Sequence, residues 1–287
     1  MDAANKPRKP WIAGLLSLIT VGNGHVYAGR ARRGLFFYVV PQSLIAAASI
    51  TLLVWVPTPA GLVFAAILFF GFAVFCIADA MRIARQNKAF YTPKRYNRWY
   101  VYLLFWAVAN LVVQPLLGAA IKRNIVQTYK IPSAAMQPTI LVGDYVLTKK
   151  HLLMDATVKR GDIVIFPYPK DPAKEFIKRV VGLGGERLEI KDKQVYIDGR
   201  PLAEPYAIHC DDRIYKADEN PRDNFGPMVI LPGYLFVMGD NRDESNDSRF
   251  WGFVPAESVS AKAHSIYWSW DKEEFNVRWR RVGIMIP

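Results

Sequence analysis

The pattern of apolar and polar positions divides the chain into two parts. Up to about residue 121 the apolar runs are long, and three of them approach or exceed the ~20 residues that a helix needs to cross a bilayer. These runs cover residues 35–56, 60–80 and 99–121. The pattern therefore predicts an N-terminal α-helical transmembrane region with three helices over residues 34–121.

Beyond residue 130 the apolar runs become short and are separated by Gly, Pro and Asp, which is typical of β-strands joined by turns. Two of the predicted strands face each other across the short turn "KDK". No amphipathic helical run of convincing length interrupts them, so residues 122–287 are expected to form a mostly β domain with a mixed or barrel-like sheet. The predicted strands are 162–168, 175–183, 186–190, 194–199, 234–240 and 258–270.

Positive charge predicts the orientation of the helices. The loop at 82–98 contains six Lys and Arg and no acid, and residues 1–33 are also basic. Cytoplasmic segments of membrane proteins carry such an excess, so both segments are expected on the cytoplasmic side. Three spans then place residues 122–287 on the extracytoplasmic side.

Residues 11–28 allow two interpretations. A basic start, an apolar run and Val26-Tyr27-Ala28 are compatible with a cleavable signal peptide. The run is short, however, "GNGH" interrupts it, and three arginines follow, which favours an interfacial or re-entrant hairpin within a cytoplasmic or interfacial segment of residues 1–33.

The charge distribution excludes a nucleic-acid-binding protein. The net charge is +12, but residues 1–130 contain 15 Lys and Arg against two acids, whereas residues 131–287 contain 22 against 23. The basic excess therefore belongs to the apolar part, as in membrane proteins. The two cysteines, Cys76 and Cys210, lie in unlike settings and are expected to be free, and no Cys/His cluster predicts a metal site.

The segment "EFIKRVVGLGGE" contains a candidate base. Side chains alternate along a strand, so Lys178 and Arg179 point to opposite faces and at least one of them must lie among apolar residues. Burial lowers the pKa of a lysine, and a neutral lysine is a usable general base. The alternative is an ordinary lysine on an edge strand.

The segment "MGDNRDESNDSRFWGFVP" is a polar turn at the end of an apolar strand. Ser245 or Ser248 is placed to hydrogen-bond a neighbouring base, although a purely structural loop is equally compatible with this composition. The charged residues expected to pair with one another and hold the turn are Asp240, Arg242, Asp243, Asp247 and Arg249. None of the histidines lies beside a Gly-x-Ser-x-Gly turn, which argues against a Ser-His-Asp triad.

The segment "IPSAAMQPTI" is stiffened by Pro132 and Pro138, because each proline fixes its own φ and restricts the residue before it. Such a frame is suited to presenting small side chains rigidly. Its central residues, Ala134 and Ala135, nevertheless offer only methyl groups.

Four blocks in this order resemble the type I signal peptidases, which are membrane-bound serine endopeptidases of bacteria. The blocks are "PSAAMQPT", "GDYVLTKK", "KRVVGLGGE" and "GDNRDESNDSRFWGFVP", and they extend from about residue 131 to 255. The resemblance implies a Ser/Lys dyad that removes signal peptides from secreted precursors after small residues, at Ala-x-Ala sites. It also implies a protein of the bacterial inner membrane, in contact with lipids and with secretory precursors, that needs no cofactor and no metal. The three predicted spans make this protein multi-pass, whereas members of the family usually have one or two spans.

The resemblance also assigns roles to residues. Lys178 corresponds to the general base, and Ser245 to the residue that orients it. Ser133 corresponds to the oxyanion donor, beside the backbone N–H of residue 135, while Asp240 and Arg242 support the site. We expect three residues near the substrate pockets, namely Ile131, Met136 and Ile177.

The family's nucleophilic serine corresponds to Ala135, so the chain as written is expected to be inactive. Ser133 is an alternative nucleophile, but it occupies the position of the oxyanion donor. Two accounts of Ala135 stay open: a deliberate Ser→Ala replacement in a peptidase, or a natural pseudoenzyme that binds signal peptides without cleaving them.

Overall fold

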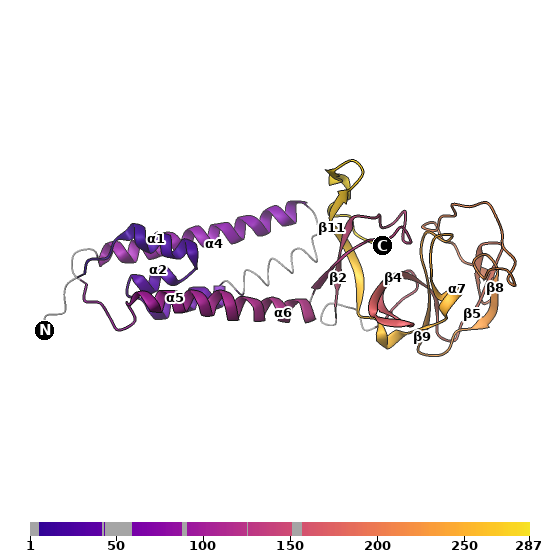
Figure 1. Ribbon diagram of the computed structural model, residues 1–287, viewed down its shortest axis with the longest axis horizontal. Coiled ribbons are helices and arrows are strands. Elements are labelled where there is room, and N and C mark those ends of the chain that lie inside the picture. Colours follow the sequence, from indigo (N-terminus) through magenta and orange to yellow (C-terminus); the bar gives the residue numbers. More distant parts are fainter. Residues whose placement is uncertain (1–5, 42, 44–58, 88–90, 125, 151–156) are drawn as a thin grey trace. The chain divides into compact units, whose positions relative to one another are not determined.

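The protein is described here by a computed structural model that covers residues 6–41, 43, 59–87, 91–124, 126–150 and 157–287 (Figure 1). The chain forms two compact units, Met1–Ile121 and Lys122–Pro287. We call them the helical unit and the β unit.

The helical unit contains two helices that are long and apolar enough to cross a membrane, over Ala66–Gln86 and Trp99–Ala120. They correspond to the second and third predicted spans, whereas most of the first predicted span lies outside the described residues. Residues 31–41 are also helical. The other elements are α1 (Pro10–Ile19), α2 (Asn23–Tyr27), α4 (Pro59–Gln86), α5 (Trp99–Ala107), a π-helical turn (Val108–Val113) and α6 (Gln114–Asn124).

Small residues allow close packing of α1 against α2 and α4. Ala13, Ala80 and Ala84 are fully buried in one cluster at this contact. A Cβ at Gly24 of α2 would lie 2.1 Å from the Ala13 carbonyl oxygen, so only glycine allows this approach. The segment around residues 11–28 therefore forms two helices, α1 and α2, that pack against each other and against α4.

The β unit contains an eight-stranded sheet in the order β1-β2-β11-β3-β4-β9-β10, with β12 paired to β11, and a four-stranded sheet in the order β7-β6-β5-β8. The larger sheet consists of β1 (Val126–Lys130), β2 (Asp144–Lys149), β3 (Ile163–Tyr168), β4 (Asp171–Leu183), β9 (Tyr234–Met238), β10 (Val254–Pro255), β11 (Ala261–Asp271) and β12 (Asn276–Val277). The smaller sheet consists of β5 (Arg187–Lys191), β6 (Gln194–Ile197), β7 (Arg200–Pro201) and β8 (Phe225–Val229).

The six predicted strands correspond to β3, β4, β5, β6, β9 and β11, and the "KDK" hairpin is confirmed by the pairing of β5 with β6. The sequence did not predict β1, β2 or β8, nor the two-residue strands β7, β10 and β12. The mixed sheet was a wrong expectation, since every pairing between the strands named above is antiparallel. Among the described residues the terminal strands β1 and β10 do not pair, so the sheet is open rather than closed into a barrel.

Strand β4 is central to the β unit because both of its faces are covered. Val180 packs into one core cluster with Val164, Phe166 and Val237. Val181 packs into a second cluster with Leu188, Ile230 and Phe236. The alternation that separates these two valines continues into the preceding residues of β4, where the candidate base lies.

Candidate active site

Lys178 and Arg179 of β4 are both buried. Lys178 is 5% exposed and Arg179 is 2% exposed. The sequence required at least one basic side chain among apolar residues, and the structure buries both because β4 is covered on each face.

The Lys178 ammonium has no carboxylate within ion-pair distance among the described residues, in contrast to its neighbour. Burial lowers the pKa of Lys178 to about 8, while the negative charges of Asp247 and Asp240 oppose this shift. At pH 7 the Lys178 amine is then neutral in about one tenth of the molecules. A buried lysine of this kind can accept a proton from a nearby hydroxyl.

The stiff segment 131–140 is held between β2 and the loop after β9. Ile131 donates its N–H to the Asp144 carbonyl oxygen at 2.9 Å and accepts a hydrogen bond from the Gly143 N–H at 3.0 Å. On the other side, the Ala135 carbonyl oxygen accepts a hydrogen bond from the Asn241 N–H at 3.1 Å. The backbone around Ala135 is thus fixed from two directions.

A single cavity of about 360 Å³ brings several predicted site residues together. Ser133 and Ala135 line it from the stiff segment, and Ile177 and Lys178 line it from β4. Sequence reasoning did not identify the remaining lining residues, which are Pro132, Glu175, Phe176, Glu244 and Asn246. Glu175 and Phe176 were detectable only as neighbours of Lys178 on the same strand.

Ser245 lies beside the Ala135 segment and is 5% exposed. A Cβ placed on Gly239 would lie 2.3 Å from the Ser245 Oγ and 2.4 Å from the Ala135 carbonyl oxygen. Both groups therefore pack directly on this glycine. Ser248 is the other serine considered. Its Oγ accepts a hydrogen bond from the Val237 N–H of β9 at 3.0 Å, so it binds this strand.

The charged residues of the loop at 239–249 pair mostly with partners outside it, which corrects the expected pairing among themselves. Only Asp247 and Arg249 pair within the loop, with an Nε–Oδ1 distance of 2.8 Å. Asp240 binds Arg179, with Nε–Oδ1 and Nη2–Oδ2 distances of 2.8 Å each.

Arg242 forms a second two-point ion pair, with Glu204, at 2.8 and 2.5 Å. Its Nε also donates to the Gly239 carbonyl oxygen at 3.1 Å. Arg179 and Glu204 are supporting residues that sequence reasoning missed, because nothing along the chain indicates which distant charge an arginine will meet.

The three expected substrate-pocket residues have different surroundings. Ile177 lines the cavity, whereas Ile131 and Met136 are 3% and 1% exposed and belong to the underlying cluster with Ile140, Val146 and Ile163. Ile177 packs against this cluster. Ile131 and Met136 therefore support the wall of the cavity from behind.

The family described as "Signal peptidase, peptidase S26" matches residues 100–268, more than half of the chain. Signal peptidase I of Aquifex aeolicus (strain VF5) is 34% identical over 200 residues, which cover 52% of this chain and 78% of that protein. Signal peptidase I of Pseudomonas aeruginosa is 32% identical over 204 residues, covering 56% of this chain and 72% of the relative.

A solved structure of a signal peptidase I from Enterococcus faecalis V583 is 31% identical and covers 38% of this chain and 98% of that chain, with a TM-score of 0.31. The residues matched by the family model include the segments that line the cavity described above. The chain belongs to the signal peptidase family, peptidase S26.

Proposed function

We propose that the β unit is the catalytic domain of a type I signal peptidase whose nucleophile position is occupied by Ala135. The observation that carries this proposal is the shared cavity of Ala135 and Lys178, in which the lysine is buried and its pKa is lowered to about 8. As written, the chain then binds precursors without cleaving them, because the methyl group of Ala135 cannot attack a carbonyl carbon.

The proposed reaction applies to a chain with serine at position 135. Neutral Lys178 accepts the proton of the serine hydroxyl while the serine Oγ bonds to the carbonyl carbon of the scissile peptide bond. Ser133 and the backbone N–H of residue 135 donate to the oxyanion. The C–N bond then breaks, and the leaving amine takes the proton from Lys178. A water molecule that gives a proton to the same lysine attacks the acyl-enzyme ester, the C–O bond to the serine Oγ breaks, and the proton returns to that oxygen.

Ser245, Asp240 and Arg242 are positioning residues in this proposal. Ser245 restricts the Lys178 amine, and the two charged residues fix the loop that contains Ser245. Their support comes from burial: Ser245 is 5% exposed, Asp240 0% and Arg242 1%. Asp240 and Arg242 are also held by two-point ion pairs, and buried polar side chains bonded in this way adopt one arrangement, which a catalytic site needs.

The substrates proposed are secretory precursors with small residues one and three positions before the cut. A wall made by Ile177 and supported by Ile131 and Met136 leaves room for alanine and excludes larger side chains. The helical unit is proposed to anchor the protein in the bacterial inner membrane with several spans. The β unit then lies on the extracytoplasmic side, where signal peptides emerge.

A second candidate function is a natural pseudoenzyme that retains signal peptides without processing them. The observation in its favour is Ala135 itself, in a frame that is otherwise complete. The codon at position 135 in the gene separates the two: a serine codon identifies a deliberate replacement, and an alanine codon identifies a pseudoenzyme.

The test is restoration of the hydroxyl in the full chain, reconstituted in lipid vesicles with a precursor that contains an Ala-x-Ala site. We expect Ala135→Ser to cleave the precursor and the unaltered chain to be inactive, because Ser133 occupies the oxyanion position. Ala134→Ser is the matched control, since it adds the same hydroxyl one residue away. Combining Ala135→Ser with Lys178→Met should abolish cleavage.

The proposal is wrong if Ala135→Ser shows no cleavage although the folded chain binds the precursor, or if cleavage persists after Lys178→Met. Cleavage by the unaltered chain would instead identify Ser133 as the nucleophile.

A further inference from the structure

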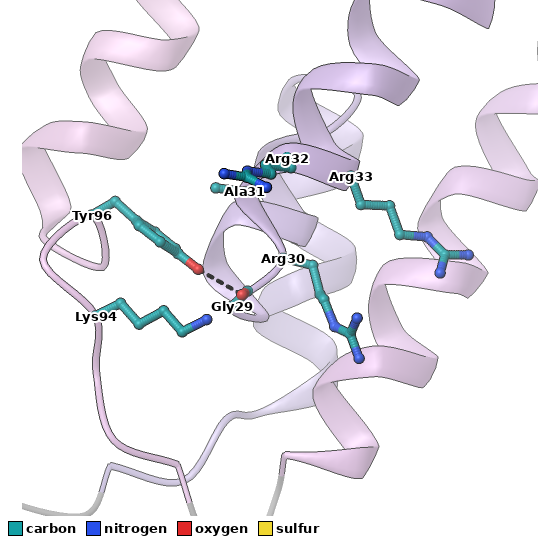
Figure 2. A pocket seen from close by; sticks show the side chains of 7 residues that line it. All are labelled: Gly29, Arg30, Ala31, Arg32, Arg33, Lys94 and Tyr96. Carbon is teal, nitrogen blue, oxygen red and sulfur yellow. Dashed lines mark hydrogen bonds between the residues drawn. The ribbon is translucent and has the colours of Figure 1, made fainter.

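The helical unit contains a cavity of about 440 Å³ that is separate from the peptidase site and is lined mainly by cations (Figure 2). Four of its seven lining residues are basic: Arg30, Arg32, Arg33 and Lys94. They come from two segments that are some sixty residues apart in the chain. The volume lies in the range of pockets that hold small ligands.

The positive charge of this cavity is only partly compensated. Asp79 is the only acid among the described residues of the helical unit. It already binds Arg33 at 3.0 Å and His25 at 2.9 Å. Arg32 and Lys94 have no acidic partner among the described residues, so the cavity retains a net positive charge.

Hydrogen bonds fix the wall of the cavity. Tyr96 donates its hydroxyl to the Gly29 carbonyl oxygen at 2.6 Å, which joins the two basic segments. A Cβ at Gly29 would lie 2.5 Å from the Tyr91 hydroxyl, so this close approach requires glycine. Figure 2 shows the Lys94 ammonium and the Arg32 guanidinium on the Tyr96 side of this junction, while Arg30 and Arg33 extend to the other side.

From this geometry we infer that the cavity binds the phosphate of an anionic lipid headgroup, with Lys94 and Arg32 as its cationic ligands. An ammonium and a guanidinium donate strong, charge-assisted hydrogen bonds to phosphate oxygens. The helical segment 31–41 begins at the cavity, and the positive end of its dipole adds to the attraction.

The location favours a lipid over a soluble anion. The helical unit contains the two apolar helices of membrane-spanning length, and the basic segments that line the cavity are those expected at the cytoplasmic surface. That surface is rich in anionic lipids, and basic pockets beside membrane helices bind their headgroups. A zwitterionic choline lipid fits less well, because no acid in the described part of this unit is free to face its cation.

The experiment uses the full chain in a nonionic detergent, with native mass spectrometry as the readout. Phosphatidylglycerol, phosphatidylcholine and inorganic phosphate are titrated separately. We expect one phosphatidylglycerol to bind with the highest affinity. Each cation near an anionic lipid contributes about fivefold to binding, so Arg32→Gln combined with Lys94→Gln should weaken it roughly twenty-five-fold.

The matched control is Arg82→Gln combined with Arg95→Gln, which removes the same charge from two exposed arginines outside the cavity. It should change the affinity less than about threefold. The exchange Arg32→Lys with Lys94→Arg keeps both charges and should retain binding, which distinguishes loss of ligands from loss of folding.

Three outcomes would overturn the inference. If Arg32→Gln with Lys94→Gln and the control variant lose the same affinity for phosphatidylglycerol, binding depends on overall charge alone. Equal affinity for phosphatidylcholine would mean that the anionic headgroup is not selected. Saturation of the same site by inorganic phosphate at equal concentration would identify a soluble anion as the ligand. None of these outcomes depends on the proposed peptidase function.

Discussion

Arg179 and Asp240 form a buried two-point ion pair that joins β4 to the loop after β9, with both N–O distances at 2.8 Å. Each partner is the chain neighbour of a residue at the candidate site, since Arg179 follows Lys178 and Asp240 follows Gly239. Thr139 donates its hydroxyl to the same carboxylate at 2.6 Å and ties in the segment that contains Ala135. The pair therefore fixes three separate segments around the cavity.

Replacing Asp240 with Asn should destabilise the β unit by roughly 3–5 kcal/mol, because it leaves the Arg179 charge buried without its counter-ion. Thermal unfolding monitored by circular dichroism measures the effect. Asp171→Asn is the control: its pair with Lys174 is largely exposed and screened by solvent, so its loss should change the stability far less. Equal effects of the two substitutions would contradict the structural role of the Arg179–Asp240 pair.

Cleavage by the Ala135→Ser variant should increase with pH, reach half of its maximum near pH 8 and level off roughly one pH unit higher. Only the neutral form of Lys178 accepts the serine proton, and burial lowers the pKa of this lysine to about 8. The pH dependence of kcat/KM for a precursor peptide measures this pKa in the free enzyme. A profile that is flat from pH 6 to 9 would exclude Lys178 as the base.

Replacing Lys178 with Met should stabilise the β unit at pH 7, by up to about 3 kcal/mol. The pKa of Lys178 is about 8 in the folded state, below its usual 10.5, so the unfolded chain binds more protons between these values. The stability of the unaltered chain should therefore rise with pH across this window, which the Met variant should not show. Thermal unfolding of both proteins at pH 7 and at pH 10 tests these statements. The same change in stability with pH in the unaltered chain and in the Met variant would contradict them.

Gly239→Ala should impair precursor cleavage in the Ala135→Ser background and destabilise the fold by roughly 1–3 kcal/mol. The added methyl group would lie 2.3 Å from the Ser245 Oγ and 2.4 Å from the Ala135 carbonyl oxygen, so both must move. Gly118→Ala is a suitable control because its added methyl group meets no atom within 4 Å. Normal cleavage by the Gly239→Ala variant would show that the spacing between Ser245 and the Ala135 segment is unimportant.

Local pattern was sufficient for much of this protein. Long apolar runs beside basic loops predicted the two apolar helices that the structure describes, and short apolar runs bounded by turn residues predicted six of the twelve strands of the two sheets. The four motif blocks indicated the family and named Ala135, Lys178, Ser133 and Ser245, three of which line or adjoin one cavity with the lysine. These features depend on neighbouring residues along the chain, so they can be read without knowing how the segments pack.

Features that depend on distant partners emerged only from the fold. Alternation places Lys178 and Arg179 on opposite faces of β4, but it does not tell which faces are covered, and here both are. The partner of Arg179 is Asp240, 61 residues away, and the partner of Arg242 is Glu204, 38 residues away. A charge in a sequence is compatible with many opposite charges, and only the packing of β4, β9 and their loops selects one of them. The same packing excludes water from Lys178 and so sets its pKa.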